Sequence, residues 1–119
     1  MQAEAGELFR IYGAVEELLL SEELEAHLLE RGTYDKHNVS LLEIVEVHQN
    51  APKYFANKGP EGGSERSAEN NAPIVLVGPT FNGRMVAVPI DPAGEGTWRP
   101  RTAFEANTHH KEKYAEGGT

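Results

Sequence analysis

The stretch from Ile74 to Ile90 constrains the fold most, because it has the pattern of two short β-strands joined by a tight turn. The runs on either side of the turn are apolar and rich in β-branched residues, which favour strands. Between them, Asn82-Gly83 is typical of a two-residue type I′ hairpin turn, which predicts that Val77 faces Val88. One face of the hairpin is then expected to hold the core residues Val75, Val77, Val86, Val88 and Ile90. The other face, with Gly78, Thr80, Met85 and Ala87, is expected to be lightly filled.

A further strand is expected from Trp98 to Phe104. Strand alternation places Trp98, Thr102 and Phe104 on the core side, and places Arg99 and Arg101 on the lightly filled side. Pro100 cannot donate to a sheet ladder, so this strand is expected at an edge or with a bulge.

Three helices are expected before residue 51. Apolar residues recur every three or four positions from Glu7 to Leu20 and predict the first helix. Ser21 has the character of an N-cap for the second. Ser40 and Glu43 form a capping box for the third, which should run from about Leu41 to Gln49.

Shorter elements complete the prediction. Lys53 to Ala56 favours a short first strand, Gly59 to Ala72 has the composition of a mobile loop, and Asn107 or Thr108 can cap a last helix. The predicted fold is α+β, with the N-terminal helices on one face of a small antiparallel sheet. We expect a single domain over residues 1–119, with a helical part at 1–50, the sheet at 51–106 including loop 59–72, and a short helix at 107–116.

Charge and composition exclude several classes of function. The first 50 residues carry eleven acidic side chains against three basic ones and account for the whole net charge of −8, whereas the rest of the chain is balanced. The absence of cysteine excludes disulfides and thiolate metal sites. There is no phosphate-binding glycine loop, and the five histidines lack zinc spacing. With no membrane-length apolar run and no signal sequence, we expect a cytoplasmic protein without metal or cofactor.

Basic and titratable residues remain as candidates for chemistry, spread over separate elements. RNA cleavage by attack of its own 2′-hydroxyl needs a base, an acid and cations around the phosphorane, and histidine, glutamate, arginine and lysine can supply these. The alternative is that the same residues form an ordinary solvated surface. The candidates are Lys36, His37, Glu43, Arg84, Arg99, Arg101, Lys111 and Tyr114, with His110 beside them.

An ordered set of these residues resembles the BrnT-like toxins of bacterial toxin–antitoxin pairs. The resemblance covers about Thr33 to Glu116 and rests on the run 36–40 followed by Glu43, the hairpin turn before Arg84, and the run 99–105 with Tyr114 downstream. It implies a RelE-type architecture, metal-independent endoribonuclease activity and inhibition by an antitoxin encoded beside the toxin. By the same resemblance, Lys36, His37, Glu43, Arg84 and Arg99 lie at positions linked to activity. From these and the other candidates, we expect His37, Glu43, Arg84 and Arg99 to be catalytic, and Lys36, Arg101, Lys111 and Tyr114 to bind substrate.

Two functional hypotheses therefore stay open. In the first, three arginines surround one RNA phosphate while His37 or Glu43 takes a proton from the ribose hydroxyl. In the second, the chain is a non-catalytic relative whose acidic helical face docks on a basic partner protein. The sequence leaves self-association open as well.

Overall fold

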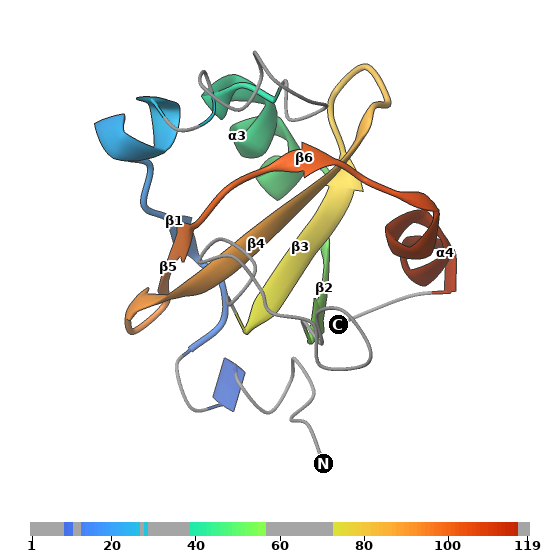
Figure 1. Ribbon diagram of the computed structural model, residues 1–119. Coiled ribbons are helices and arrows are strands. Elements are labelled where there is room, and N and C mark those ends of the chain that lie inside the picture. Colours follow the sequence, from blue (N-terminus) through green and yellow to red (C-terminus); the bar gives the residue numbers. More distant parts are fainter. Residues whose placement is uncertain (1–8, 11–12, 27, 29–38, 57–72, 117–119) are drawn as a thin grey trace, which may run out of the picture.

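The computed structural model describes residues 9–10, 13–26, 28, 39–56 and 73–116. Lys36, His37 and the loop 59–72 lie outside these residues. The described chain has the expected α+β fold, in which helices pack against a six-stranded sheet (Figure 1).

The sheet is antiparallel except at one margin. Its strand order is β1-β5-β4-β3-β2, and β6 also pairs with β4. Only the pairing of β1 with β5 is parallel among the described strands. The strands are β1 (Glu17–Leu18), β2 (Lys53–Ala56), β3 (Ile74–Pro79), β4 (Met85–Gly94), β5 (Thr97–Pro100) and β6 (Phe104–Glu105).

The β3–β4 hairpin has a longer turn than the sequence predicted, and its register is shifted by one residue. The Thr80 N–H donates to the Arg84 carbonyl at 2.8 Å, which leaves three residues in the loop, and Gly83 closes it with a φ of 91°. This is the pattern of a turn followed by a left-handed glycine bulge. Val77 therefore pairs with Ala87, not with Val88.

This shift changes which side chains share a face, because successive strand residues point to opposite sides. Val75 and Val77 are buried as expected, but they pack with Ala87 in a second cluster and not with Val86 and Val88. Both faces of the sheet are consequently covered. The prediction that one face of the hairpin is lightly filled is therefore wrong. The first cluster contains Leu24, Leu28, Val39, Ile44, Val47, Ile74, Leu76, Val86, Val88, Ile90, Trp98 and Ala103.

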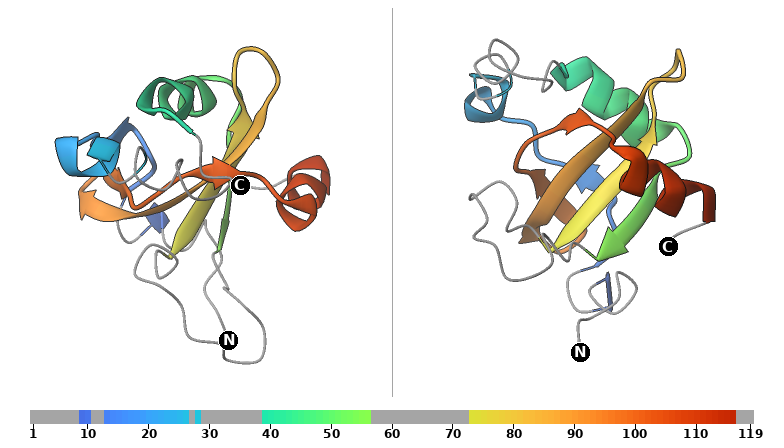
Figure 2. Two further views of the ribbon diagram at one scale, coloured as in Figure 1. Left: turned by 45° about the horizontal axis from the view of Figure 1, so that its top comes forward. Right: turned by 45° about the vertical axis from the view of Figure 1, so that its right-hand side comes forward.

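Helices α3 (Leu41–Gln49) and α4 (Thr108–Glu116) cover the two faces of the sheet, as the two further views also show (Figure 2). The capping box of α3 is confirmed, and so is the cap of α4, where the Asn107 side chain accepts from the His110 N–H at 2.9 Å. Residues 22–26 are helical, and Ser21 caps them by accepting from the Leu24 N–H.

The helix predicted from Glu7 to Leu20 is wrong in its second half. Residues 9–10 are helical, but Gly13 takes a φ of 89°, and its N–H donates to the Phe9 carbonyl as at the end of a helix. The chain then forms β1, and the Leu19 N–H donates to the Trp98 carbonyl at 2.8 Å. A Cβ at position 13 would lie 2.7 Å from the Gly96 nitrogen, so the close approach of these two backbone segments requires glycine at position 13.

The strand predicted from Trp98 to Phe104 is divided into β5 and β6. Pro100 ends β5, and the Arg101 N–H then donates to the Pro89 carbonyl at 2.8 Å. Trp98 and Thr102 are fully buried as expected, but Phe104 packs in the second cluster, on the other face from Trp98. The break at residues 101–103 interrupts the alternation on which the prediction relied.

Candidate functional site

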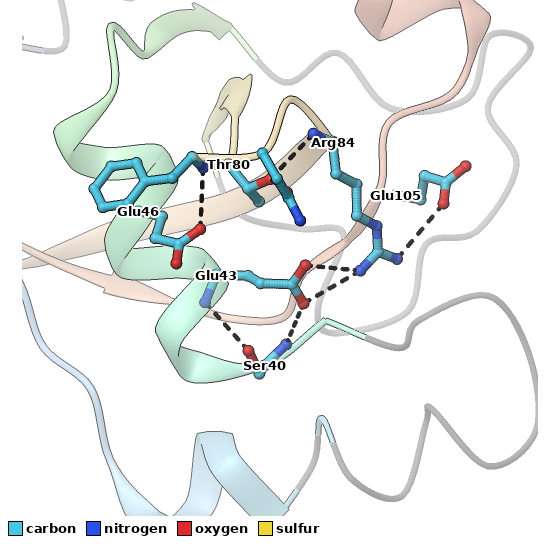
Figure 3. A network of polar contacts seen from close by, with 8 residues as sticks. Ser40, Glu43, Glu46, Thr80, Arg84 and Glu105 are labelled. Atoms are coloured by element: carbon cyan, nitrogen blue, oxygen red, sulfur yellow. Dashed lines mark hydrogen bonds and ion pairs between the residues drawn. The ribbon is translucent and has the colours of Figure 1, made fainter.

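Two of the expected site residues meet where the start of α3 faces the β3–β4 hairpin (Figure 3). The Arg84 Nη1 donates to both carboxylate oxygens of Glu43, at 3.2 Å and 3.0 Å. The two residues are 41 positions apart in the chain, and about a quarter of each side chain is exposed. Their contact joins the helix to the hairpin.

The Glu43 carboxylate is also part of the helix cap. Its Oε1 accepts from the Ser40 N–H at 3.1 Å, while the Ser40 hydroxyl accepts from the Glu43 N–H at 3.2 Å. A carboxylate in the first turn of a helix also interacts favourably with the helix dipole. Glu43 is thus held by its own helix and presents a fixed anion to Arg84.

A second carboxylate reaches the same guanidinium. Glu105 on β6 lies 3.5 Å from the Arg84 Nη2, and half of its side chain is exposed. Sequence reasoning did not identify Glu105, because its approach to Arg84 depends on the pairing of β6 with β4, which no local pattern indicates.

Side-chain hydrogen bonds hold the turn that precedes Arg84 in place. The Thr80 hydroxyl, which is buried, accepts from the Arg84 N–H at 3.0 Å and donates to the Asn82 side chain at 2.6 Å. The Asn50 side chain, at the end of α3, donates to the carbonyls of Pro79 and Thr80. These bonds fix the base of the turn, so the Arg84 side chain starts from a defined position.

The other two expected arginines lie around a different carboxylate. Arg101 donates to Asp91 at 2.8 Å, and Arg99 donates to the two Asp91 oxygens at 3.3 Å and 3.4 Å. Asp91 was not identified from the sequence, because its contact with the arginines depends on the pairing of β4 with β5.

These arginines do not share a site with Arg84. Asp91 lies seven positions after Arg84 along the extended chain of β4, which is about 23 Å at about 3.3 Å per residue. By strand alternation, Arg84 lies on the same face as Val86, which is covered by α3. Asp91 lies on the same face as Ala87, which is covered by α4. The prediction that Arg84, Arg99 and Arg101 surround one phosphate is therefore wrong.

The two expected residues of α4 lie apart from Glu43 as well. The Tyr114 hydroxyl donates to the Ala51 carbonyl at 2.8 Å, and Lys53 donates to the Tyr114 carbonyl at 2.8 Å with its amine 4.6 Å from the centre of the ring. Ala51 has a φ of 53°, in the left-handed region. Tyr114 thus fastens α4 to the chain after α3. Lys111 is exposed.

Burial perturbs two titratable groups outside this site. Desolvation lowers the pKa of His110, and the charge of His109 lowers it further. The buried Nδ1 of His110 has no hydrogen-bond partner among the described residues, and the ring lies 5.7 Å from that of Phe104. Desolvation also raises the pKa of Tyr54 to about 12.

The described residues contain no group of three or more side chains suited to hold a metal ion. They also contain no helix with the length and apolar character needed to cross a membrane. Compared with known protein families, curated proteins and solved structures, the chain matches none.

Proposed function

We propose that this protein is a toxin-like, metal-independent endoribonuclease of a toxin–antitoxin pair that acts in the cytoplasm. The observation that carries the proposal is the contact between Glu43 and Arg84, at 3.0 Å across 41 residues of chain. The resemblance to BrnT-like toxins selects both residues for activity, and this contact gives them the common location that an active site needs.

In this proposal Arg84 stabilises the negative charge that develops on the phosphorane. A guanidinium donates two parallel hydrogen bonds to a phosphate, and a positioned donor of this kind contributes most when the charge forms. Glu43 positions Arg84 and does not act as the base, because its carboxylate oxygens already accept bonds from Ser40 and Arg84. His37 is proposed as the base by resemblance alone.

The proposed partner is an antitoxin that holds the enzyme inactive. The excess of acidic residues, 19 against 11 lysines and arginines, supports a partner with basic segments.

The test is RNA cleavage by the purified protein, freed of any partner, in the presence of a chelator. The wild type should cut RNA and should spare an oligonucleotide in which 2′-deoxyribose replaces ribose, because the attacking hydroxyl is then absent. Arg84→Lys keeps the charge but loses the planar fork, so it should cut about 100-fold more slowly. No cleavage by the wild type would refute the proposal.

A second candidate function is a non-catalytic interaction module. It is supported by the pairing of Arg84, Arg99 and Arg101 with carboxylates, which reduces their attraction for a phosphate. Growth arrest on induced expression, relieved by co-expression of an adjacent reading frame, would favour the toxin. Normal growth together with inactive purified protein would favour the module.

A further inference from the structure

Two large apolar side chains are exposed on the two elements that meet at the junction of α3 and the hairpin. Leu42 is 66% exposed and Phe81 is 64% exposed. Glu46 lies one helical turn after Leu42, and its Oε1 accepts from the Phe81 N–H at 3.0 Å. We call the surface formed by Leu42, Glu46 and Phe81 the α3–hairpin surface.

Packing among the residues that the structure describes does not explain an aromatic side chain at Phe81, in the hairpin turn. Tight turns favour Gly, Asn, Asp and Ser, and an exposed phenylalanine there leaves apolar surface in water. The side chains of Thr80 and Glu46 nevertheless fix the backbone of the turn. A rigidly presented aromatic residue loses little conformational entropy on binding, which suits it to anchor a partner.

The charge around this surface selects the partner. At this junction the described residues include three carboxylates: Glu43 and Glu105 contact the guanidinium of Arg84, and Glu46 contacts the Phe81 N–H. Negative charges therefore exceed the positive charge of Arg84. The Oε1 of Glu46 is used by the Phe81 N–H, and its second oxygen can accept from a lysine or arginine brought by a partner. An acidic partner, or a second copy of this chain with its net charge of −8, would be repelled.

We propose that the α3–hairpin surface docks a basic amphipathic segment of a partner protein. An apolar side chain of the segment packs between Leu42 and Phe81, and a neighbouring lysine or arginine pairs with Glu46. The proposal does not depend on RNA cleavage. If the proposed function also holds, the segment belongs to the antitoxin, and it lies beside Arg84, where it obstructs the phosphate.

The test selects peptides without assuming a partner. A displayed library of random peptides of about twelve residues is selected against the full chain, and the enriched peptides are synthesised. They should combine apolar residues with lysine or arginine, and the double variant Leu42→Ser/Phe81→Ser should bind them at least about tenfold more weakly. The matched control is Leu19→Ser, which removes an exposed leucine on the far side of β5 and should bind like the wild type.

A charge variant tests the second half of the proposal. Glu46→Gln keeps an acceptor for the Phe81 N–H but loses the charge, so it should weaken peptide binding and reduce its dependence on salt. Glu112→Gln makes the same change on the exposed side of α4 and should leave binding unchanged.

Three results would overturn the proposal: no enriched peptide, enriched peptides that are acidic, or equal binding by the double variant and the wild type. Self-association of the wild type that Phe81→Ser abolishes would also overturn it, because the occupant would then be a second copy. Unfolding temperatures within about 2 °C of wild type would show that the variants stay folded, as expected for substitutions at exposed positions. This test does not measure RNA cleavage. A failure of the docking proposal can therefore be distinguished from a failure of the proposed function.

Discussion

The Glu43–Arg84 pair should contribute measurably to folding, and its contribution can be separated from that of the helix cap. The variants are Glu43→Gln, Arg84→Met and the double substitution. Gln at position 43 keeps an acceptor for the Ser40 N–H, as a capping box allows, while losing the charge that Arg84 contacts. The double-mutant cycle therefore reports the ion pair and leaves the cap in place.

The expected coupling energy follows from the geometry. Opposite charges 4 Å apart attract by about 1 kcal/mol in water and about 4 kcal/mol at an effective dielectric constant of 20, before the cost of desolvation. Measured exposed pairs contribute about 0.2 to 1 kcal/mol. Because Glu43 is already fixed by its helix and the Arg84 Nη1 reaches both of its carboxylate oxygens, we expect about 1 kcal/mol, at the upper end of that range.

The cycle is measured by urea unfolding at low salt and at about 0.5 M NaCl, which should reduce the coupling. A second cycle on Glu105 and Arg84 serves as the comparison. That contact is 3.5 Å long and Glu105 is 51% exposed, so its coupling should be about 0.3 kcal/mol or less. A Glu43 coupling no larger than the Glu105 coupling would refute the view that Glu43 is the residue that positions Arg84.

Three further predictions concern stability and titration. Ile44→Ala should lower the free energy of unfolding by about 2 to 4 kcal/mol in urea, because Ile44 is fully buried between α3 and the sheet; a loss below about 1 kcal/mol would contradict this packing. Since burial lowers the pKa of His110 from 6.5, the unfolded chain binds this proton more readily, and stability should fall as the pH drops below 6.5; His110→Gln should flatten that dependence relative to wild type. Burial raises the pKa of Tyr54 to about 12, so one of the four tyrosines should ionise late in an absorbance titration, and Tyr54→Phe should remove this step. The stability that comes from keeping Tyr54 protonated should be lost as the pH rises from 10 toward 12.

Elements specified by neighbouring residues were predicted well from the sequence. The start of α3 depends on Ser40 and Glu43, which are three positions apart, and the cap of α4 depends on Asn107 and His110. The hairpin was located correctly but its register was not, because Asn82-Gly83 suits both a two-residue turn and a three-residue turn. Contacts of Thr80 with distant residues such as Asn50 accompany the longer turn, and no local pattern contains them.

The candidate site was predicted only in part, because its contacts join residues that are distant in the sequence. Periodicity could not bring Glu43 and Arg84 together. Their residue types made both of them candidates, and the family resemblance selected both. Arg99 and Arg101 were assigned to that site because the Trp98–Phe104 stretch was treated as one alternating strand. Both arginines instead pair with Asp91, which lies seven positions along β4 from Arg84 and on the other face of the sheet.

The most direct test of the proposed function compares Arg84→Ala with Arg99→Ala in single-turnover cleavage of RNA by the purified protein with a chelator present. Losing a positioned cation from the transition state costs about 2.7 to 4 kcal/mol, so Arg84→Ala should cut about 100-fold to 1,000-fold more slowly than wild type. Arg99→Ala, whose side chain pairs with Asp91 on the opposite face of the sheet, should stay within a few-fold of wild type. Cleavage lost in Arg99→Ala and kept in Arg84→Ala, or no cleavage by the wild type, would contradict an active site at Arg84.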